Sequence, residues 1–432
     1  MKKIFFIIIY LFSFISLYPQ NPEWIVYNTS NSGLINNHIS VIVPDSYGNV
    51  YIGCLQSLVK YDGYNWTVYT DSGLGNVLNG VFSLAIDSNN CKWIGTSSVG
   101  LLKFNDTSWT VYNTSNSGLP DNEVRSLAID NNNIKWIGTE NGLAKFDGAN
   151  WTVYNTSNSP LPSNYIYAIA IDDSSNLWIG AYLGGLVKYD GTNWTIYNTL
   201  NSGLPSDLII CITIDGSNNK WIGTYWSGLA KFDGTNWEVF NNANWGVYCL
   251  EVNTVCIDSD NVKWIGLGSW VFPGNYNIGG LVKYNGIEWT VYDTSNTILP
   301  DNYIESIAID GYGNKWIGTI GSGIAVYREG GVVNVEEQSK TSVSSFKFTL
   351  SQNFPNPFNP VTTIKYSVPN TSHISMVVYN ILGREIQTLV KEEKQPGTYT
   401  VQFDGSNLSS GVYFYVMRAD NFIETKKFVL LK

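Results

Sequence analysis

A repeat of about 42 residues runs through most of the sequence and restricts the folds open to the chain. An aromatic residue followed by Ile-Gly recurs at steps of 42, 43, 42, 43, 43 and 52 residues, at Tyr51, Trp93, Trp136, Trp178, Trp221, Trp264 and Trp316. A second series begins each Trp-Thr-Val-Tyr-like run, at Trp24, Trp66, Trp109, Trp151, Trp194, Trp237 and Trp289. Each unit holds four short apolar runs separated by Asn, Asp or Gly, typical of four β-strands joined by tight turns. This pattern predicts a β-propeller with seven blades.

The two ends of the repeat indicate how the ring closes. The chain enters with a lone Trp-type strand, 24–28, before any other strand of the repeat, and no tryptophan follows Tyr327. We therefore expect the N-terminal strand to complete the last blade, which leaves no unpaired sheet edge at the seam. Within each blade the Leu-Ala-Ile-Asp run is predicted to be innermost, followed outward by Lys-Trp-Ile-Gly-Thr, Gly-Leu-Ala-Lys-Phe and Trp-Thr-Val-Tyr. The propeller is expected to span residues 21–328.

The segments outside the repeat have distinct compositions. Residues 1–20 read as a signal peptide, with Lys2 and Lys3 before an apolar run of 14 residues. That run is shorter than the roughly 20 residues of a membrane span, and no later stretch is apolar enough to span. Residues 329–345 read as a linker, and residues 346–432 show six or seven short strands of their own, which predicts a small Ig-like β-sandwich. The fold class is therefore all-β.

Composition excludes several kinds of function. A net charge of −10 disfavours nucleic acid as a partner, and two histidines (His38 and His373) leave little room for histidine catalysis or a metal site. Five irregularly spaced cysteines suggest no disulfide framework, so we expect mainly buried thiols, although a single pair is open. No nucleophile elbow or zinc motif is present. We expect no cofactor and no metal, and carboxylates remain the one route to catalysis.

The repeat, in the form Ile-Ala-Ile-Asp-x-x-Asn-Asn-Lys-Trp-Ile-Gly-Thr-x-x-Gly-Leu-Ala-Lys-Phe-Asp-Gly-Thr-Asn-Trp, resembles the two-component-regulator propeller repeat over about 300 residues. That family builds the periplasmic sensing propellers of hybrid histidine kinases and also occurs in stand-alone secreted proteins. The resemblance implies the propeller fold. We expect no kinase role, because no membrane span or kinase segment follows the repeat.

The C-terminal segment is similar to the type A sorting domain of the type IX secretion system of Bacteroidetes-like bacteria. The similarity lies in four motifs, represented by Asn356, Pro357, Phe358, Asn359 and Pro360, by Gly383, by Gly411 and Tyr413, and by Lys426 and Lys427. It implies contact with the secretion machinery and transport through the periplasm to the cell surface or the medium. Members of this family are usually cleaved, and the mature protein is released or attached to surface polysaccharide. The alternative is an ordinary Ig-like module that mediates contacts.

A repeated aspartate ends the innermost strand of every blade: Asp45, Asp87, Asp130, Asp172, Asp215, Asp258 and Asp310. A ring of carboxylates could bind a cation. Each is followed by Ser, Asn or Gly before the next strand, however, where an Asp side chain accepts hydrogen bonds from its own turn. We therefore expect these residues to be structural.

Departures from the repeat are the better guide to function. Three tryptophans lie outside both series: Trp226, Trp245 and Trp270, the last within a nine-residue insertion. The loops after the second and fourth strands emerge on one face, so we expect an aromatic rim there that also includes Tyr182, Tyr225, Phe272 and Tyr276. Such a rim would suit a glycan or a protein ligand. The alternative is that these rings pack on one another to hold the insertion.

The sequence thus predicts a secreted binding protein for a glycan or protein ligand. A different class of function is an enzyme, such as a polysaccharide lyase, a glycosidase or a lactonase, that uses carboxylates near the central axis. A periplasmic sensor is a third. The oligomeric state is left open.

Overall fold

The computed structural model describes residues 23–69, 80–249, 251–271, 276–332 and 348–431, the last range with gaps at 351–352, 354–355, 369–370, 382, 396 and 420–421. The predicted signal peptide and most of the predicted linker lie outside these residues. The chain divides into two compact units, Met1–Asn334 and Val335–Lys432.

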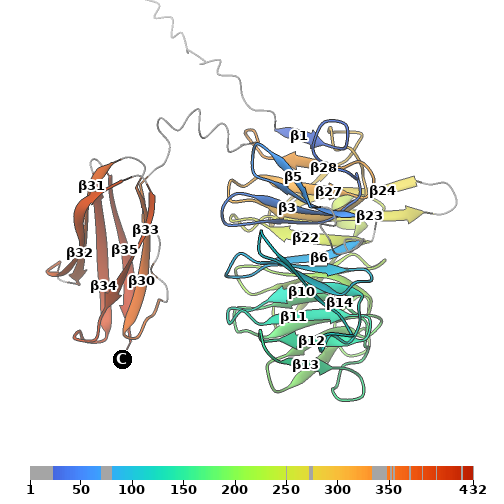
Figure 1. The fold of residues 1–432 in the computed structure, drawn as a ribbon, viewed down its shortest axis with the longest axis horizontal. Helices are drawn as coiled ribbons and strands as arrows, with labels where there is room; N and C mark the ends of the chain where they lie inside the picture. Colours follow the sequence, from blue (N-terminus) through green and yellow to red (C-terminus); the bar gives the residue numbers. More distant parts are fainter. Residues whose placement is uncertain are drawn as a thin grey trace, which may run out of the picture. The chain divides into compact units, whose positions relative to one another are not determined.

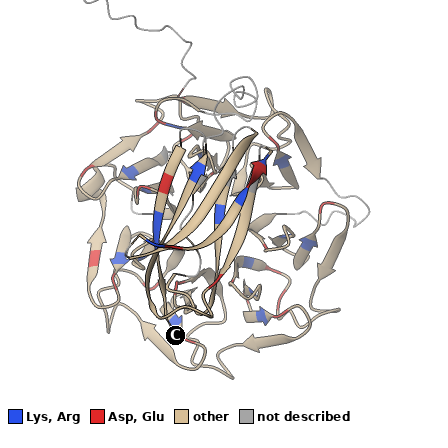
Figure 2. Cartoon of the chain, turned by 90° about the vertical axis from the view of Figure 1, so that its left-hand side faces the viewer, with Lys and Arg blue, Asp and Glu red and all other residues tan. Residues whose placement is uncertain are grey.

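The first unit contains seven antiparallel sheets of four strands, arranged around a central axis (Figures 1 and 2). The first three blades, from the axis outward, are β2 (Ile39–Pro44), β3 (Val50–Cys54), β4 (Ser57–Tyr61) and β5 (Trp66–Tyr69); β6 (Val81–Ile86), β7 (Lys92–Thr96), β8 (Leu101–Phe104) and β9 (Trp109–Tyr112); β10 (Val124–Ile129), β11 (Lys135–Thr139), β12 (Gly142–Phe146) and β13 (Trp151–Tyr154).

Three further blades follow in the same order. They are β14 (Ile166–Ile171), β15 (Leu177–Ala181), β16 (Gly185–Tyr189) and β17 (Trp194–Tyr197); β18 (Ile209–Ile214), β19 (Lys220–Thr224), β20 (Leu229–Phe232) and β21 (Trp237–Phe240); β22 (Val252–Ile257), β23 (Lys263–Val271), β24 (Tyr276–Tyr284) and β25 (Trp289–Tyr292). The strand order within each blade is the predicted one.

The seventh blade draws on both ends of the unit. It contains β26 (Ile304–Ile309), β27 (Lys315–Thr319) and β28 (Ile324–Tyr327), and β1 (Trp24–Tyr27) pairs with β28 as its outermost strand, with Trp24 opposite Tyr327. Each innermost strand contacts the innermost strand of the next blade, and β26 contacts β2.

Neighbouring blades are joined by the repeated aspartate, the Ile-Gly tryptophan and a lysine. Asp87 accepts hydrogen bonds from the backbone N–H groups of Asn89 and Cys91 and, at 3.0 Å, from the indole of Trp93. Lys135 of the next blade lies 3.6 Å from the Asp87 carboxylate and 4.7 Å from the centre of the Trp93 ring. These contacts confirm the structural role predicted for Asp87, because every acceptor oxygen is used inside the protein.

The loops after the outermost strands cover the tryptophans of the following blade. A Cβ atom at Gly118 would lie 2.3 Å from the Cβ atom of Trp151, so glycine lets the loop pack directly on the tryptophan. In the loop before the sixth blade, the one-turn helix α1 (Asn242–Trp245) takes this place. Trp245 is 4% exposed, and its ring centre lies 5.7 Å from that of Trp289. The expectation of an exposed Trp245 is therefore wrong, since its ring packs against Trp289, the tryptophan that this loop covers.

The second unit is a sandwich of two sheets. One contains β29 (Thr349–Leu350), β30 (Val361–Val368) and β33 (Gly397–Asp404), and the other contains β31 (Ser372–Asn380), β32 (Glu385–Lys394), β34 (Gly411–Ala419) and β35 (Phe422–Leu430). Buried side chains from both sheets form its core. Phe358 of the first sorting motif is buried beside the last strand, where its N–H donates to the Val429 carbonyl at 3.0 Å. Tyr413 is also buried, so these motif residues serve the fold of the domain.

Candidate functional site

All seven innermost strands contain a β-bulge at their second residue. In β10, for example, Val124 pairs with Thr139 and Ser126 with Gly138, which leaves Arg125 without an opposite residue. The seven bulged residues, here called the bulge ring, are Ser40, Phe82, Arg125, Tyr167, Ile210, Asn253 and Glu305. Bulges redirect side chains and are common next to functional sites. The flanking strand residues are small or aliphatic in every blade, whereas the bulge ring is chemically different in each, which points to recognition.

Arg125 connects the bulge ring across three blades. Its guanidinium carbon lies 4.2 Å from the centre of the Phe82 ring and 5.8 Å from that of Tyr167, the equivalent residues of the two neighbouring blades. The guanidinium also pairs with Glu123, and it lies 3.6 Å from Glu140. Burial raises the pKa of Glu123, and Arg125 offsets part of that rise. The positive charge of Arg125 is therefore compensated within the protein.

Three tyrosines of the fourth blade stack beside Arg125. The ring centre of Tyr165 lies 5.0 Å from that of Tyr167 and 5.3 Å from that of Tyr182, at interplanar angles below 30°. Tyr182 follows β15 and is fixed by a 2.8 Å hydrogen bond from its N–H to the Tyr165 carbonyl. Its side chain is 38% exposed. The stack thus offers an aromatic surface of fixed orientation.

The fifth blade adds a second aromatic pair, which is held by a buried acid. Tyr225 and Trp226 lie 4.4 Å apart between ring centres, and Trp226 is 66% exposed. Trp226, Tyr225 and Ser269 donate hydrogen bonds to the carboxylate of Glu251. Glu251 is buried, and this burial raises its pKa despite the three donors.

Trp226 has an unusual backbone conformation. Its φ angle is +65°, in the left-handed region that bulky residues rarely adopt. Backbone strain of this kind costs about 1–3 kcal/mol and collects at functional sites. An exposed tryptophan in this conformation is therefore a strong candidate for ligand contact.

The seventh blade contributes an acid without a partner. Glu305 makes no hydrogen bond or ion pair within the part of the chain that the structure describes, and burial raises its pKa to about 7. Tyr303 precedes it by two residues. Burial raises the pKa of Tyr303, and the nearby charges of Glu305 and Glu251 raise it further. Asn253 donates hydrogen bonds to the carbonyls of Gly268 and Ile304, at 3.2 and 3.0 Å.

These contacts form a continuous aromatic and acidic arc on the face where the second strands end. The arc comprises Phe82, Glu123, Arg125, Glu140, Tyr165, Tyr167, Tyr182, Tyr225, Trp226, Glu251, Tyr303 and Glu305. Three of the seven predicted rim residues, Tyr182, Tyr225 and Trp226, lie in it.

The remaining predicted rim residues lie elsewhere or outside the description. Trp270 and Tyr276 belong to the part of the β23–β24 hairpin that extends beyond the ring (Figure 1), where Trp270 pairs with Asn277 and Val271 with Tyr276. The insertion is therefore a lengthened hairpin. Phe272 lies outside the described residues. Neither the bulge ring nor Glu251 was predicted from the sequence. The signal available for the bulge ring was the second position of the innermost strand, which holds a different residue type in each blade.

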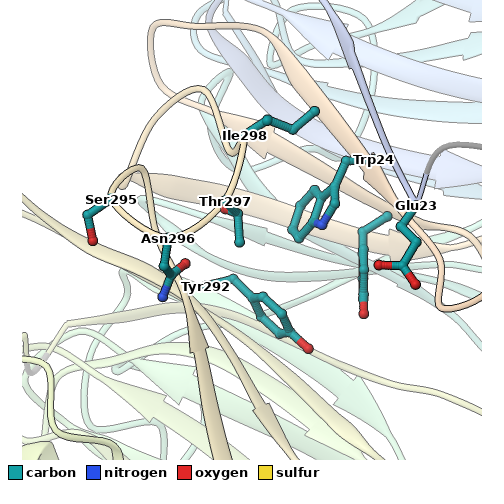
Figure 3. Close-up of a pocket in the computed structure, with 8 residues that line it drawn as sticks. Glu23, Trp24, Tyr292, Ser295, Asn296, Thr297 and Ile298 are labelled. Carbon is teal, nitrogen blue, oxygen red and sulfur yellow. The ribbon is translucent and has the colours of Figure 1, made fainter.

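A cavity of about 480 Å³ lies at the seam between the sixth blade and the closing strand (Figure 3). In this loop Ile298 stands at the position where Gly33, Gly118 and Gly203 pack against a tryptophan in three other loops, and the corresponding tryptophan here is Trp24. Two of its polar residues are bonded within the loop, since Asn296 donates to the Val291 carbonyl and Thr297 to the Asp293 carbonyl. We therefore assign the functional site to the arc.

The described residues contain no group of three or more His, Cys, Asp or Glu side chains placed to hold a metal ion, and no helix long and apolar enough to cross a membrane. All five cysteines are free thiols. Burial raises the pKa values of Cys54, Cys211, Cys249 and Cys256, which makes these thiols poor nucleophiles.

Two family matches agree with the repeat and with the C-terminal motifs. Residues 33–56 and 160–182 match the two-component regulator propeller family, and residues 352–431 match the secretion system C-terminal sorting domain. No curated protein sequence matches the chain.

Similar solved structures are propeller proteins. The extracellular domain of BT3049 from B. thetaiotaomicron, assigned as a hybrid two-component system, has 20% identity and a TM-score of 0.59, over 95% of this chain and 57% of that one. PorZ, a surface component of the type IX secretion system of Porphyromonas gingivalis, has 17% identity and a TM-score of 0.55, over 94% and 61%. Virginiamycin B lyase from Staphylococcus aureus has 13% identity and a TM-score of 0.56, over 70% and 98%.

At these identities the likeness concerns the fold, and the chain spans about three fifths of the length of BT3049 and PorZ. The sorting domain implies engagement with the type IX secretion machinery and secretion to the cell surface. The chain thus combines a propeller built from regulator-type repeats with a C-terminal type IX sorting domain.

Proposed function

We propose that the protein is a glycan-binding propeller of the cell surface and that its ligand lies on the arc. The observation that carries this proposal is Trp226, which is exposed, strained in its backbone and held by Glu251 beside a stack of tyrosines. Sugar rings pack their C–H faces on aromatic rings, and their hydroxyl groups bond to carboxylates. The arc supplies both kinds of contact.

A glycan array with the full-length secreted protein tests this function. Trp226→Ala and Tyr182→Ala should each weaken binding about five- to tenfold, because the loss of a stacking partner is worth about 1.0–1.4 kcal/mol. Tyr47→Ala is the matched control, since Tyr47 is 74% exposed in the β2–β3 turn on the opposite face. Binding that is unchanged in both arc variants, or lost equally in the control, would contradict the proposal.

A second function, hydrolysis or eliminative cleavage of a polysaccharide, is favoured by one observation. The pKa of about 7 for Glu305 suits a general acid, because a carboxyl group must keep its proton near neutral pH to protonate a leaving group. Release of new reducing or unsaturated ends from a glycan that binds on the array, abolished by Glu305→Gln, would establish this activity. Binding without product release would exclude it for that glycan.

A further inference from the structure

The arc contains more acidic groups than basic ones. It contains four carboxyl groups, those of Glu123, Glu140, Glu251 and Glu305, and one guanidinium, that of Arg125, which is already paired with Glu123. Burial lowers the pKa of nearby His38, so this residue adds no positive charge at neutral pH. The loops that lead into the innermost strands add further acids on the same face, including Asp121, Asp207 and Asp301.

The lysines of the propeller lie towards the opposite face. Five begin a second strand, as Lys135 does, and six stand next to last in a third strand, as Lys145 does. Second strands begin, and third strands end, at the face away from the arc. Figure 2 shows the basic residues spread around the ring. The other members of the two sets are Lys92, Lys220, Lys263 and Lys315, and Lys60, Lys103, Lys188, Lys231 and Lys283.

Resting on the proposed function, we infer that the glycan bound by the arc carries free amino groups, as in a glucosamine-containing polysaccharide. An ammonium group is attracted to the faces of aromatic rings and to carboxylates that lack a counter-charge. Tyr303 and Tyr225 supply such rings. Glu305, which has no partner among the described residues, holds a proton near neutral pH in the empty site. An ammonium group beside it favours release of that proton, so the carboxylate forms when the amino sugar binds. An N-acetylated or acidic sugar at the same position offers no cation, and an acidic sugar would be repelled.

The direct test compares two probes of equal length on the full-length protein. These are the β-1,4-linked glucosamine hexamer and its fully N-acetylated counterpart, titrated calorimetrically at pH 6.5 in low salt. The amine hexamer should bind about tenfold more tightly, a difference of about 1.4 kcal/mol. The preference should fall at high salt, because ions screen charge attraction.

Two variants assign the preference to the arc. Glu305→Gln should abolish the preference for the amine hexamer while the N-acetylated hexamer binds as before. Glu288→Gln removes an equal charge from an exposed position in the β24–β25 turn, on the opposite face, and should leave the preference intact. Tryptophan fluorescence verifies that both variants are folded.

Each alternative result has a definite meaning. Equal affinity for the two hexamers would overturn the amino-sugar inference and leave glycan binding standing. Binding of a lysine-rich peptide without binding of either hexamer would overturn both the amino-sugar assignment and the proposed glycan function. If Glu305→Gln kept the preference for the amine hexamer, the assignment of the amino-sugar site to Glu305 would be overturned.

Discussion

Replacing Glu305 by glutamine should change how the stability of the propeller depends on pH. Its carboxyl group has a usual pKa of 4.5, which burial raises to about 7. Between these pH values the folded protein keeps a proton that the unfolded chain has released. The free energy of unfolding therefore falls as the pH rises through this window. At about 1.4 kcal/mol for each pH unit, the loss reaches about 3 kcal/mol by pH 8.

Glutamine carries no ionisable proton, so this loss should be absent from Glu305→Gln. Relative to the parent protein, the variant should gain up to about 3 kcal/mol of stability between pH 4.5 and pH 8. Urea unfolding followed by tryptophan fluorescence measures the change. All 16 tryptophans lie between Trp24 and Trp316, so the signal reports the propeller and not the sorting domain. Parallel stability curves for variant and parent across this pH range would refute the reasoning.

Two further predictions concern packing between blades. Asp172→Asn should lower the free energy of unfolding by about 2–4 kcal/mol, because Asp172 is buried and accepts hydrogen bonds from Asn176 and from the Trp178 indole. Urea unfolding measures this change. The control is Asp190→Asn in an exposed turn, and an equal loss of stability in this variant would contradict the argument. Trp245→Ala should lower the free energy of unfolding by about 3–5 kcal/mol without weakening glycan binding. If the folded variant lost glycan binding, Trp245 would belong to the ligand site.

The regular part of this molecule was predictable because it repeats. Neighbouring blades pack in the same way, so an aspartate and an aromatic residue recur at the spacing of Asp87 and Trp93. This recurrence indicated that both residues are structural. The order of strands and the joining of β1 to β28 followed from counting copies.

The site was less predictable, for two physical reasons. Exposure depends on what a neighbouring loop leaves uncovered, so Trp226 and Trp245 look alike in sequence and differ sixteenfold in exposure, at 66% and 4%. Function also draws on a bulge, whose existence depends on how two strands register and not on the identity of the bulged residue. The sequence therefore did not distinguish Glu305 from an ordinary strand residue.

The pairing of Trp24 with Tyr327 makes the two ends of the propeller depend on each other. β1 is made among the first residues of the folded unit, and its partner β28 about 300 residues later. Bringing such distant segments together has a high entropic cost and tends to slow folding. A fragment that stops before β28 keeps an open sheet edge at β1, which is a surface prone to aggregation and to proteolysis. The pairing of β1 with β28 can therefore form only after the seventh blade has been synthesised, so a shortened chain cannot complete the propeller.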